Sequence, residues 1–125
     1  MKIVFLVQNL FTSRDYLRYG IEELIISSKK EVEVWDISKI IYPNVEFNYQ
    51  EFSDIKLNNL CKIIRFNSPK EFELHVNNSN VFYCFVLLVF NFKSLFIFKT
   101  LSNNKIICVS SGYGMINIHP YFNYN

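Results

Sequence analysis

Three residues early in the chain, Thr12, Ser13 and Arg14, carry side chains suited to holding an anion. They stand where a polar turn gives way to an amphipathic segment, the position at which a helix would begin. The free backbone amides of a helix N-terminus bind phosphate or carboxylate groups, and a nearby arginine adds positive charge. Ordinary capping by Thr or Ser explains the same residues and is the commoner use of the pattern. If they bind an anion, these three residues belong to a substrate-binding site, and we predict that role for them.

A second candidate substrate-binding loop lies at Ser110, Ser111, Gly112 and Gly114. It follows an apolar run typical of a strand, and ligands of open parallel sheets bind beyond the carboxyl ends of the strands. Glycines let the backbone approach a ligand closely, and serine hydroxyls both donate and accept hydrogen bonds. A tight turn at the end of the strand is the plainer explanation of the same glycines.

The turn over residues 8–14 lacks both glycine-rich phosphate-binding patterns, GxGxxG and GxxxxGK[ST]. Their absence argues against NAD and ATP, and we predict no cofactor. Asp36 ends a predicted strand, where dinucleotide-binding folds place the acid that binds a ribose. Without the glycines, we interpret Asp36 and Ser38 as residues that cap the following turn.

The histidines and cysteines show no metal-ligand spacing, so no metal site is predicted. Cys61, Cys84 and Cys108 each lie inside an apolar run, and we interpret them as buried core thiols of a reducing compartment. His75 and His119 have no neighbouring carboxylate or cysteine in the sequence, and structural roles are expected for both, although His119 could face a cleft. No nucleophile, base and acid can be grouped, so the catalytic residues stay unassigned.

The first 37 residues indicate how these groups would be positioned. An apolar run at 3–7 predicts a strand covered on both faces, residues 15–30 predict a helix, and 31–37 predict a second strand. Gly20 interrupts the helix, either because the helix approaches the sheet closely or as a tolerated surface residue. The predicted core stripe of this helix is Leu17, Ile21, Leu24, Ile25 and Ser28.

The same rhythm continues after a weakly patterned region. We expect a strand at 60–66, a helix with Pro69 at its first position, a strand at 81–90, a helix over 91–104 and a strand at 105–110. The resulting fold class is α/β, a Rossmann-like three-layer sandwich with a mostly parallel sheet of about five strands. We expect residues 1–125 to form one domain that is truncated, with 115–125 as an irregular tail.

A transmembrane helix over residues 81–98 is the competing interpretation of the most apolar stretch. Asn91, Lys93 and Ser94 interrupt it, and its length is marginal for a membrane span. A lysine near the centre of a span costs about 2.5–3.5 kcal/mol on insertion scales. We favour a strand, a turn and a helix for these residues.

Composition excludes some partners. The chain has 125 residues, of which 50% are hydrophobic, 18% aromatic and 19% charged, with a net charge of +2. This apolar content argues for a packed core and against disorder. No block of lysines or arginines is present to follow a phosphate backbone, so nucleic acid is not an expected partner.

Three segments of the opening unit carry a family resemblance: MKIVFLV at 1–7, GIEEL at 20–24 and EVEVWD at 31–36. Together they resemble the start of the N-terminal domain of GT-B type glycosyltransferases and related capsule and surface-polysaccharide biosynthesis proteins. The resemblance covers about the first 40 residues. It implies a Rossmann-like domain on the acceptor side, whereas the nucleotide-sugar donor is held by a C-terminal domain that the 125 residues do not contain.

The resemblance implies a glycosyltransferase-like domain of bacterial cell-surface polysaccharide biosynthesis that is inactive alone. Its expected partners are a sugar or lipid-linked acceptor and a missing C-terminal domain or a second copy, with peripheral membrane contact as a further option. The expected location is cytoplasmic or membrane-peripheral. The alternatives are a non-catalytic flavodoxin-like binding or regulatory module and a small membrane-associated protein that uses residues 81–98.

Overall fold

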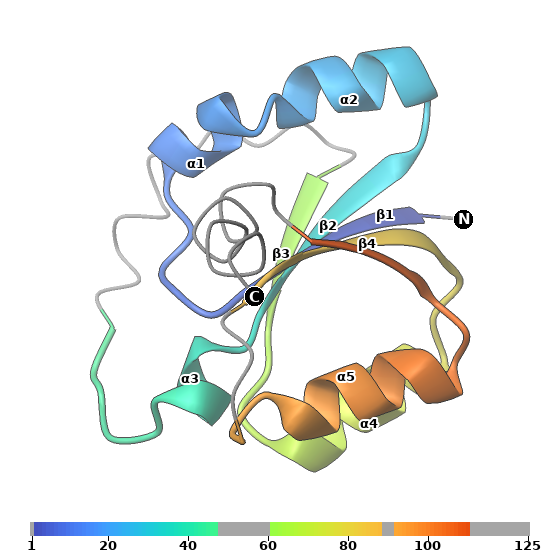
Figure 1. Ribbon diagram of the computed structural model, residues 1–125. Coiled ribbons are helices and arrows are strands. Elements are labelled where there is room, and N and C mark those ends of the chain that lie inside the picture. Colours follow the sequence, from blue (N-terminus) through green and yellow to red (C-terminus); the bar gives the residue numbers. More distant parts are fainter. Residues whose placement is uncertain (1, 48–60, 89–91, 111–125) are drawn as a thin grey trace, which may run out of the picture.

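The computed structural model describes residues 2–47, 61–88 and 92–110. Five strands form one sheet in the order β3-β2-β1-β4-β5, and all neighbouring strands are parallel (Figure 1). They are β1 (Lys2–Val7), β2 (Glu31–Asp36), β3 (Cys61–Arg65), β4 (Val81–Leu87) and β5 (Ile107–Ser110). The predicted α/β fold class with a parallel sheet of about five strands is confirmed.

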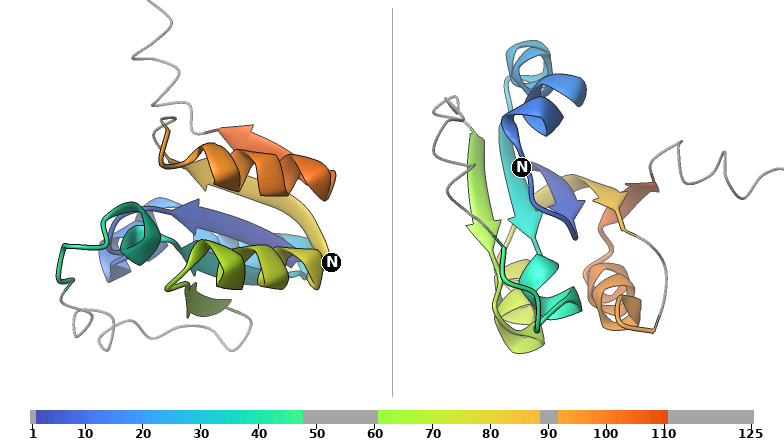
Figure 2. Two further views of the ribbon diagram at one scale, coloured as in Figure 1. Left: turned by 90° about the horizontal axis from the view of Figure 1, so that it is seen from below. Right: turned by 90° about the vertical axis from the view of Figure 1, so that its left-hand side faces the viewer.

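Helices cover both faces of this sheet. One face carries α1 (Ser13–Arg18) and α2 (Ile21–Ser28), and the other carries α3 (Ser38–Ile41), α4 (Pro69–Asn77) and α5 (Leu95–Asn103) (Figure 1). On the second face α4 and α5 lie side by side (Figure 2). The three layers are therefore a helix layer, the sheet and a second helix layer.

The central strand β1 is buried on both faces, as its continuous apolar run predicts. Ile3, Phe5 and Val7 belong to the core under α1 and α2. Val4 and Leu6 point to the opposite core, which α3, α4 and α5 cover. Because successive side chains of β1 point to opposite faces of the sheet, this strand contributes to both cores.

The helix predicted over 15–30 is two helices, and this part of the prediction is wrong. Gly20 lies between α1 and α2 in the left-handed region, with φ 61° and ψ 39°. The break changes the phase of the helical stripe, so Tyr16 is buried and Leu17 is 74% exposed. Gly20 is thus neither a close-packing residue nor a tolerated surface glycine, because it forms the junction itself.

The helix at Pro69 begins as the sequence predicts. Ser68 is its N-cap and accepts a hydrogen bond from the Glu71 backbone amide at 3.2 Å, and Pro69 occupies the first turn. Phe72 and Val76 are buried beneath this helix. The pattern of Pro and Ser therefore located the helix start because both act through the local backbone.

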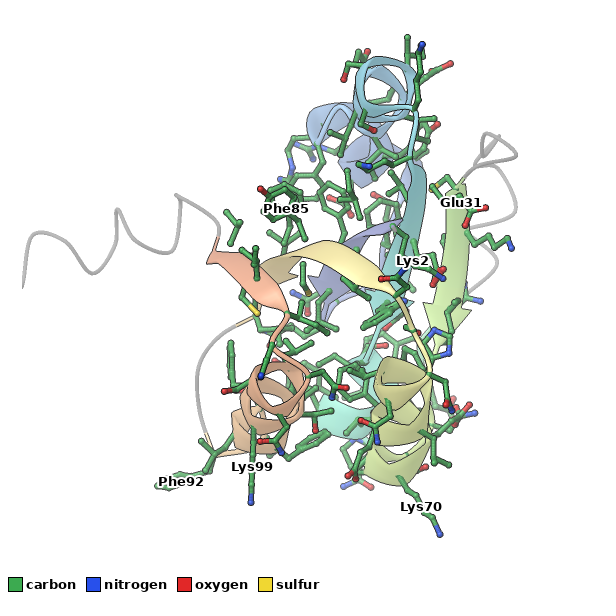
Figure 3. The ribbon with its side chains drawn as sticks, turned by 90° about the vertical axis from the view of Figure 1, so that its right-hand side faces the viewer. Lys2, Glu31, Lys70, Phe85, Phe92 and Lys99 are labelled. Atoms are coloured by element: carbon green, nitrogen blue, oxygen red, sulfur yellow. The ribbon has the colours of Figure 1, made fainter. Side chains whose placement is uncertain are left out.

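The segment 81–98 is divided between a strand and a helix, not a single long helix. No described helix reaches the length and apolar character needed to cross a membrane. Phe85 points from β4 toward the side of α1 and α2, and Phe92 precedes α5 with its side chain 95% exposed (Figure 3). Residues 89–91 of the predicted strand and turn lie outside the described residues.

Glu33, on β2, has a buried carboxylate on the side of the sheet that α4 covers. It accepts hydrogen bonds from Lys2 Nζ at 2.5 Å and from Trp35 Nε1 at 3.0 Å, and His75 Nε2 is 3.6 Å away. Burial opposes ionisation of Glu33, but the bonds from Lys2 and Trp35 outweigh it and lower its pKa. His75 has the structural role that the sequence predicts, packed edge-on against Trp35.

Candidate ligand-binding site

A small cavity lies at the carboxyl end of β1, beside the end of β4. After β1 the chain adds β2 and β3 on one side of β1, and it then adds β4 and β5 on the other side. The strand order therefore reverses between β1 and β4. Ligands of open α/β sheets bind at such points. The cavity has a volume of about 170 Å³ and is lined by Val7, Gln8, Asn9, Leu10, Phe11, Asp15, Arg18, Tyr19 and Leu87.

The size of the cavity limits what it can hold. Ligand pockets commonly measure about 300–1,000 Å³, and this cavity has about 170 Å³. It therefore has room for a small molecule or for one end of a larger one. Its lining combines amide side chains at Gln8 and Asn9 with the apolar side chains of Val7 and Leu87.

Helix α1 positions the charged part of the lining. Arg18 Nη2 donates to Asp15 Oδ1 and to the Tyr19 hydroxyl, each at 2.9 Å. The guanidinium carbon also lies 4.9 Å from the centre of the Tyr19 ring, which packs against Phe5 with 5.8 Å between ring centroids. The Asp15 carboxylate partly neutralises the charge of Arg18. This wall of the cavity therefore offers hydrogen-bonding groups without a strong positive charge.

The N-terminus of α1 is capped by its own side chains. Thr12 Oγ1 accepts from the Asp15 amide at 3.3 Å, and Asp15 Oδ2 accepts from the Thr12 amide at 3.0 Å. These two hydrogen bonds form a capping box, the ordinary structural role that the sequence also allows for Thr12. Ser13 and Arg14 are exposed and do not line the cavity. Substrate binding by Thr12, Ser13 and Arg14 stays a prediction.

Of the second candidate loop, the structure describes Ser110. Ser110 is the last residue of β5, and β4 lies between β5 and β1. Because these strands are parallel, Ser110 lies at the same carboxyl edge of the sheet as the end of β1. Ser111, Gly112 and Gly114 lie outside the described residues, and so does His119. A ligand role for this loop stays a prediction.

Asp36 caps the turn after β2, as we interpreted it from the sequence. Its Oδ1 accepts a hydrogen bond from the Ser38 amide at 2.8 Å, and Arg65 Nε lies 3.8 Å from Oδ2. Burial raises the pKa of Asp36 against the lowering effect of the Ser38 bonds. The side chain does not line the cavity, so the role of a ribose-binding acid is not supported by its position.

The sequence missed Arg18 and Tyr19 as cavity residues. Gln8 and Asn9 belong to the turn over 8–14, which precedes the predicted helix. Asp15, Arg18 and Tyr19 are three and four residues apart, a spacing that places helical side chains together. That spacing was the available signal, since it brings the second half of α1 over the turn that ends β1.

Among residues 2–47, 61–88 and 92–110, no group of three or more His, Cys, Asp or Glu side chains could hold a metal ion. No family model, curated protein or solved structure matches this chain.

Proposed function

We propose that this chain is the acceptor-side domain of a glycosyltransferase-like protein of cell-surface polysaccharide biosynthesis. The observation that carries the proposal is the cavity at the strand-order reversal, lined by Gln8, Asn9 and Tyr19. Amides suit a sugar, because its hydroxyls exchange hydrogen bonds with them, and the Tyr19 hydroxyl can donate a further hydrogen bond. The resemblance of the first 40 residues to GT-B N-terminal domains supports the same assignment.

The proposed role is binding and orientation of the acceptor, not transfer of the sugar by this chain alone. Arg18 would donate hydrogen bonds to acceptor hydroxyls, and Asp15 would hold its guanidinium in place. The nucleotide-sugar donor would be held by a second domain, as the resemblance implies. No catalytic residue is assigned within residues 1–125.

The flavodoxin-like alternative meets an obstacle in the strand order. In flavodoxin-like sheets the third strand lies next to the first strand. Here β3 lies beyond β2 at one edge of the described sheet, and β4 lies next to β1. A binding module without catalysis remains the second candidate function, but on the observed topology.

Sugar binding can be tested by NMR titration of the ¹⁵N-labelled chain with methyl glucoside and with N-acetylglucosamine. We expect millimolar binding, with amide shifts concentrated at Gln8, Asn9 and Tyr19. Arg18→Ala should weaken binding about tenfold, which corresponds to about 1.4 kcal/mol for hydrogen bonds lost from a charged donor.

Lys70→Ala is the control, because Lys70 is exposed on α4, on the other face of the sheet, and does not line the cavity. It should bind like the parent chain. Shifts absent for both sugars, or equal losses in the Arg18 and Lys70 variants, would contradict an acceptor site in this cavity. The genomic sequence downstream of the Asn125 codon tests the transferase assignment separately, since a donor-binding domain should be encoded there.

A further inference from the structure

Two cysteines stand opposite each other on neighbouring strands at one edge of the sheet. Cys84 on β4 and Cys108 on β5 are direct partners in the parallel register. Adjacent strands lie about 4.8 Å apart, and disulfides join Cα atoms that are about 4.4–6.8 Å apart. Register partners of a parallel pair share a face, and each thiol shifts the pKa of the other, while Cys108 Sγ donates to the Ile106 carbonyl oxygen at 3.6 Å. The two thiols are therefore close enough to interact.

The pair is chemically asymmetric. Cys108 is exposed, in contrast to the expectation that all three cysteines are buried, whereas Cys84 has no exposed surface. The hydrogen bond from Cys84 lowers the pKa of Cys108 to about 7, against the opposing effect of burial. The same bond, together with burial, raises the pKa of Cys84. An accessible thiolate thus lies beside a protected thiol, the arrangement of an attacking and a resolving cysteine.

We propose that Cys84 and Cys108 form a redox-responsive pair that closes into a disulfide between β4 and β5 on exposure to a low-molecular-weight disulfide. The Cys108 thiolate attacks one sulfur of the oxidant, forming a mixed disulfide and releasing one thiolate. Cys84 then loses its proton and attacks the Cys108 sulfur, releasing the second thiolate. Two protein thiols are oxidised, and one oxidant disulfide is reduced to two thiols.

The second step becomes easier once the first has occurred. In the mixed disulfide Cys108 no longer carries a negative charge, so the neighbouring thiolate that opposes ionisation of Cys84 is gone. The position of β5 at the edge of the described sheet leaves its strand free to adjust to the bond. A bond made at an accessible edge should also be reversible, because exposed disulfides are the more readily reduced ones.

The third cysteine provides an internal comparison. Cys61 is buried on β3 in the core under α1 and α2, on the other side of β1 from the pair. Burial raises its pKa to about 11. It should therefore remain reduced under conditions that oxidise the pair.

The experiment is treatment of the reduced full chain with oxidised glutathione, followed by acid quenching, alkylation and intact-mass and peptide mass spectrometry. We expect a monomer lighter by two hydrogens, a peptide that links Cys84 to Cys108, and alkylation only at Cys61. Cys61→Ser should react as the parent chain does. Cys84→Ala should stop at a stable glutathione adduct on Cys108.

Cys108→Ser keeps the interior intact, because the substituted residue is exposed. It should leave Cys84 reduced and prevent any intramolecular bond, with circular dichroism showing that the variant is folded. A parent chain that accumulates the Cys108 adduct, forms disulfide-linked dimers or loses Cys61 at the same rate would overturn the proposal.

Discussion

Glu33 is a buried acid whose charged form is stabilised by three neighbouring side chains. Lys2 and Trp35 donate hydrogen bonds to it, and His75 Nε2 lies 3.6 Å from its Oε1. Since its folded pKa is lower than its ordinary value of 4.5, Glu33 contributes stability above that value. The contribution is lost as the pH falls through the folded pKa. Asp36, whose pKa is raised, has the opposite sign and does not share this acid sensitivity.

Glu33→Gln should lower the free energy of unfolding by about 1–2 kcal/mol at pH 7, because a charge-assisted bond to Lys2 is lost. An amide oxygen can still accept from Trp35, so the variant should fold. Urea unfolding at pH 7 and pH 4 measures the effect, and the gap between parent and variant should narrow at the lower pH. Glu31→Gln, an exposed substitution on the same strand, is the control and should change neither value. An equal gap at both pH values would contradict the assigned charge.

Cys108 should react as an unusually acidic thiol. The rate of its alkylation by iodoacetamide should rise with pH to a midpoint near 7, the value to which the bond from Cys84 lowers its pKa. Cys84→Ala removes that bond and should move the midpoint upward. Peptide mass spectrometry resolves the rates site by site, and Cys61, with a pKa of about 11, serves as the slow reference. A midpoint unaffected by Cys84→Ala would contradict the hydrogen bond.

At the scale of elements, α2 is bounded by two left-handed residues. Gly20 precedes it with φ 61°, and Lys29 follows it with φ 56°. A Cβ on Gly20 would meet only Glu23 at 3.5 Å, an ordinary contact, so conformational strain and not a clash decides the cost. Gly20→Ala should therefore destabilise the chain by about 1–2 kcal/mol.

Lys29→Gly is the mirror of this substitution, because it removes a side chain from a strained left-handed position. It should stabilise the chain by about 1 kcal/mol. Thermal and urea unfolding of both variants measure the two changes. Shifts of the same sign would show that the backbone at one junction differs from the one described.

The strands and the helices α4 and α5 follow from the sequence because their signals are local, whereas α3 lies in the weakly patterned region and was not predicted. The run at 3–7 has no polar residue to turn outward, and Ser68 with Pro69 fixes a helix start through the backbone alone. The division of the first helix does not follow, since a glycine inside an apolar pattern has the same signature whether it is helical or left-handed. The exposure of Cys108 depends on β5 being an edge strand, which strand order decides.

The sequence predicts where the candidate site lies, but it does not predict which side chains contact one another there. Parallel pairing predicts that ligands meet the carboxyl ends of the strands, and the turn over residues 8–14 follows the first of these ends. The sequence could not show that Asp15 is engaged with the Thr12 amide and with Arg18. Such contacts depend on side-chain rotamers that no spacing specifies.

At the scale of the whole molecule, Trp35 reports on the described fold from its interior. It has no exposed surface and contacts Phe66 and Phe72 edge-on, while it also donates to Glu33. The two cores share the sheet, so they should unfold as one cooperative unit. Urea transitions followed by Trp35 fluorescence and by far-ultraviolet circular dichroism should coincide. Separate midpoints would contradict the prediction of a single domain.

The place of β1 in the middle of the sheet also has a consequence for synthesis on the ribosome. Its first partner, β2, emerges soon after it, but its second partner, β4, ends at Leu87. Until that residue leaves the exit tunnel, one side of β1 presents unpaired backbone groups and apolar side chains to the surroundings. The nascent chain is therefore most exposed to aggregation and to chaperone binding from the emergence of β1 until β4 has also left the exit tunnel.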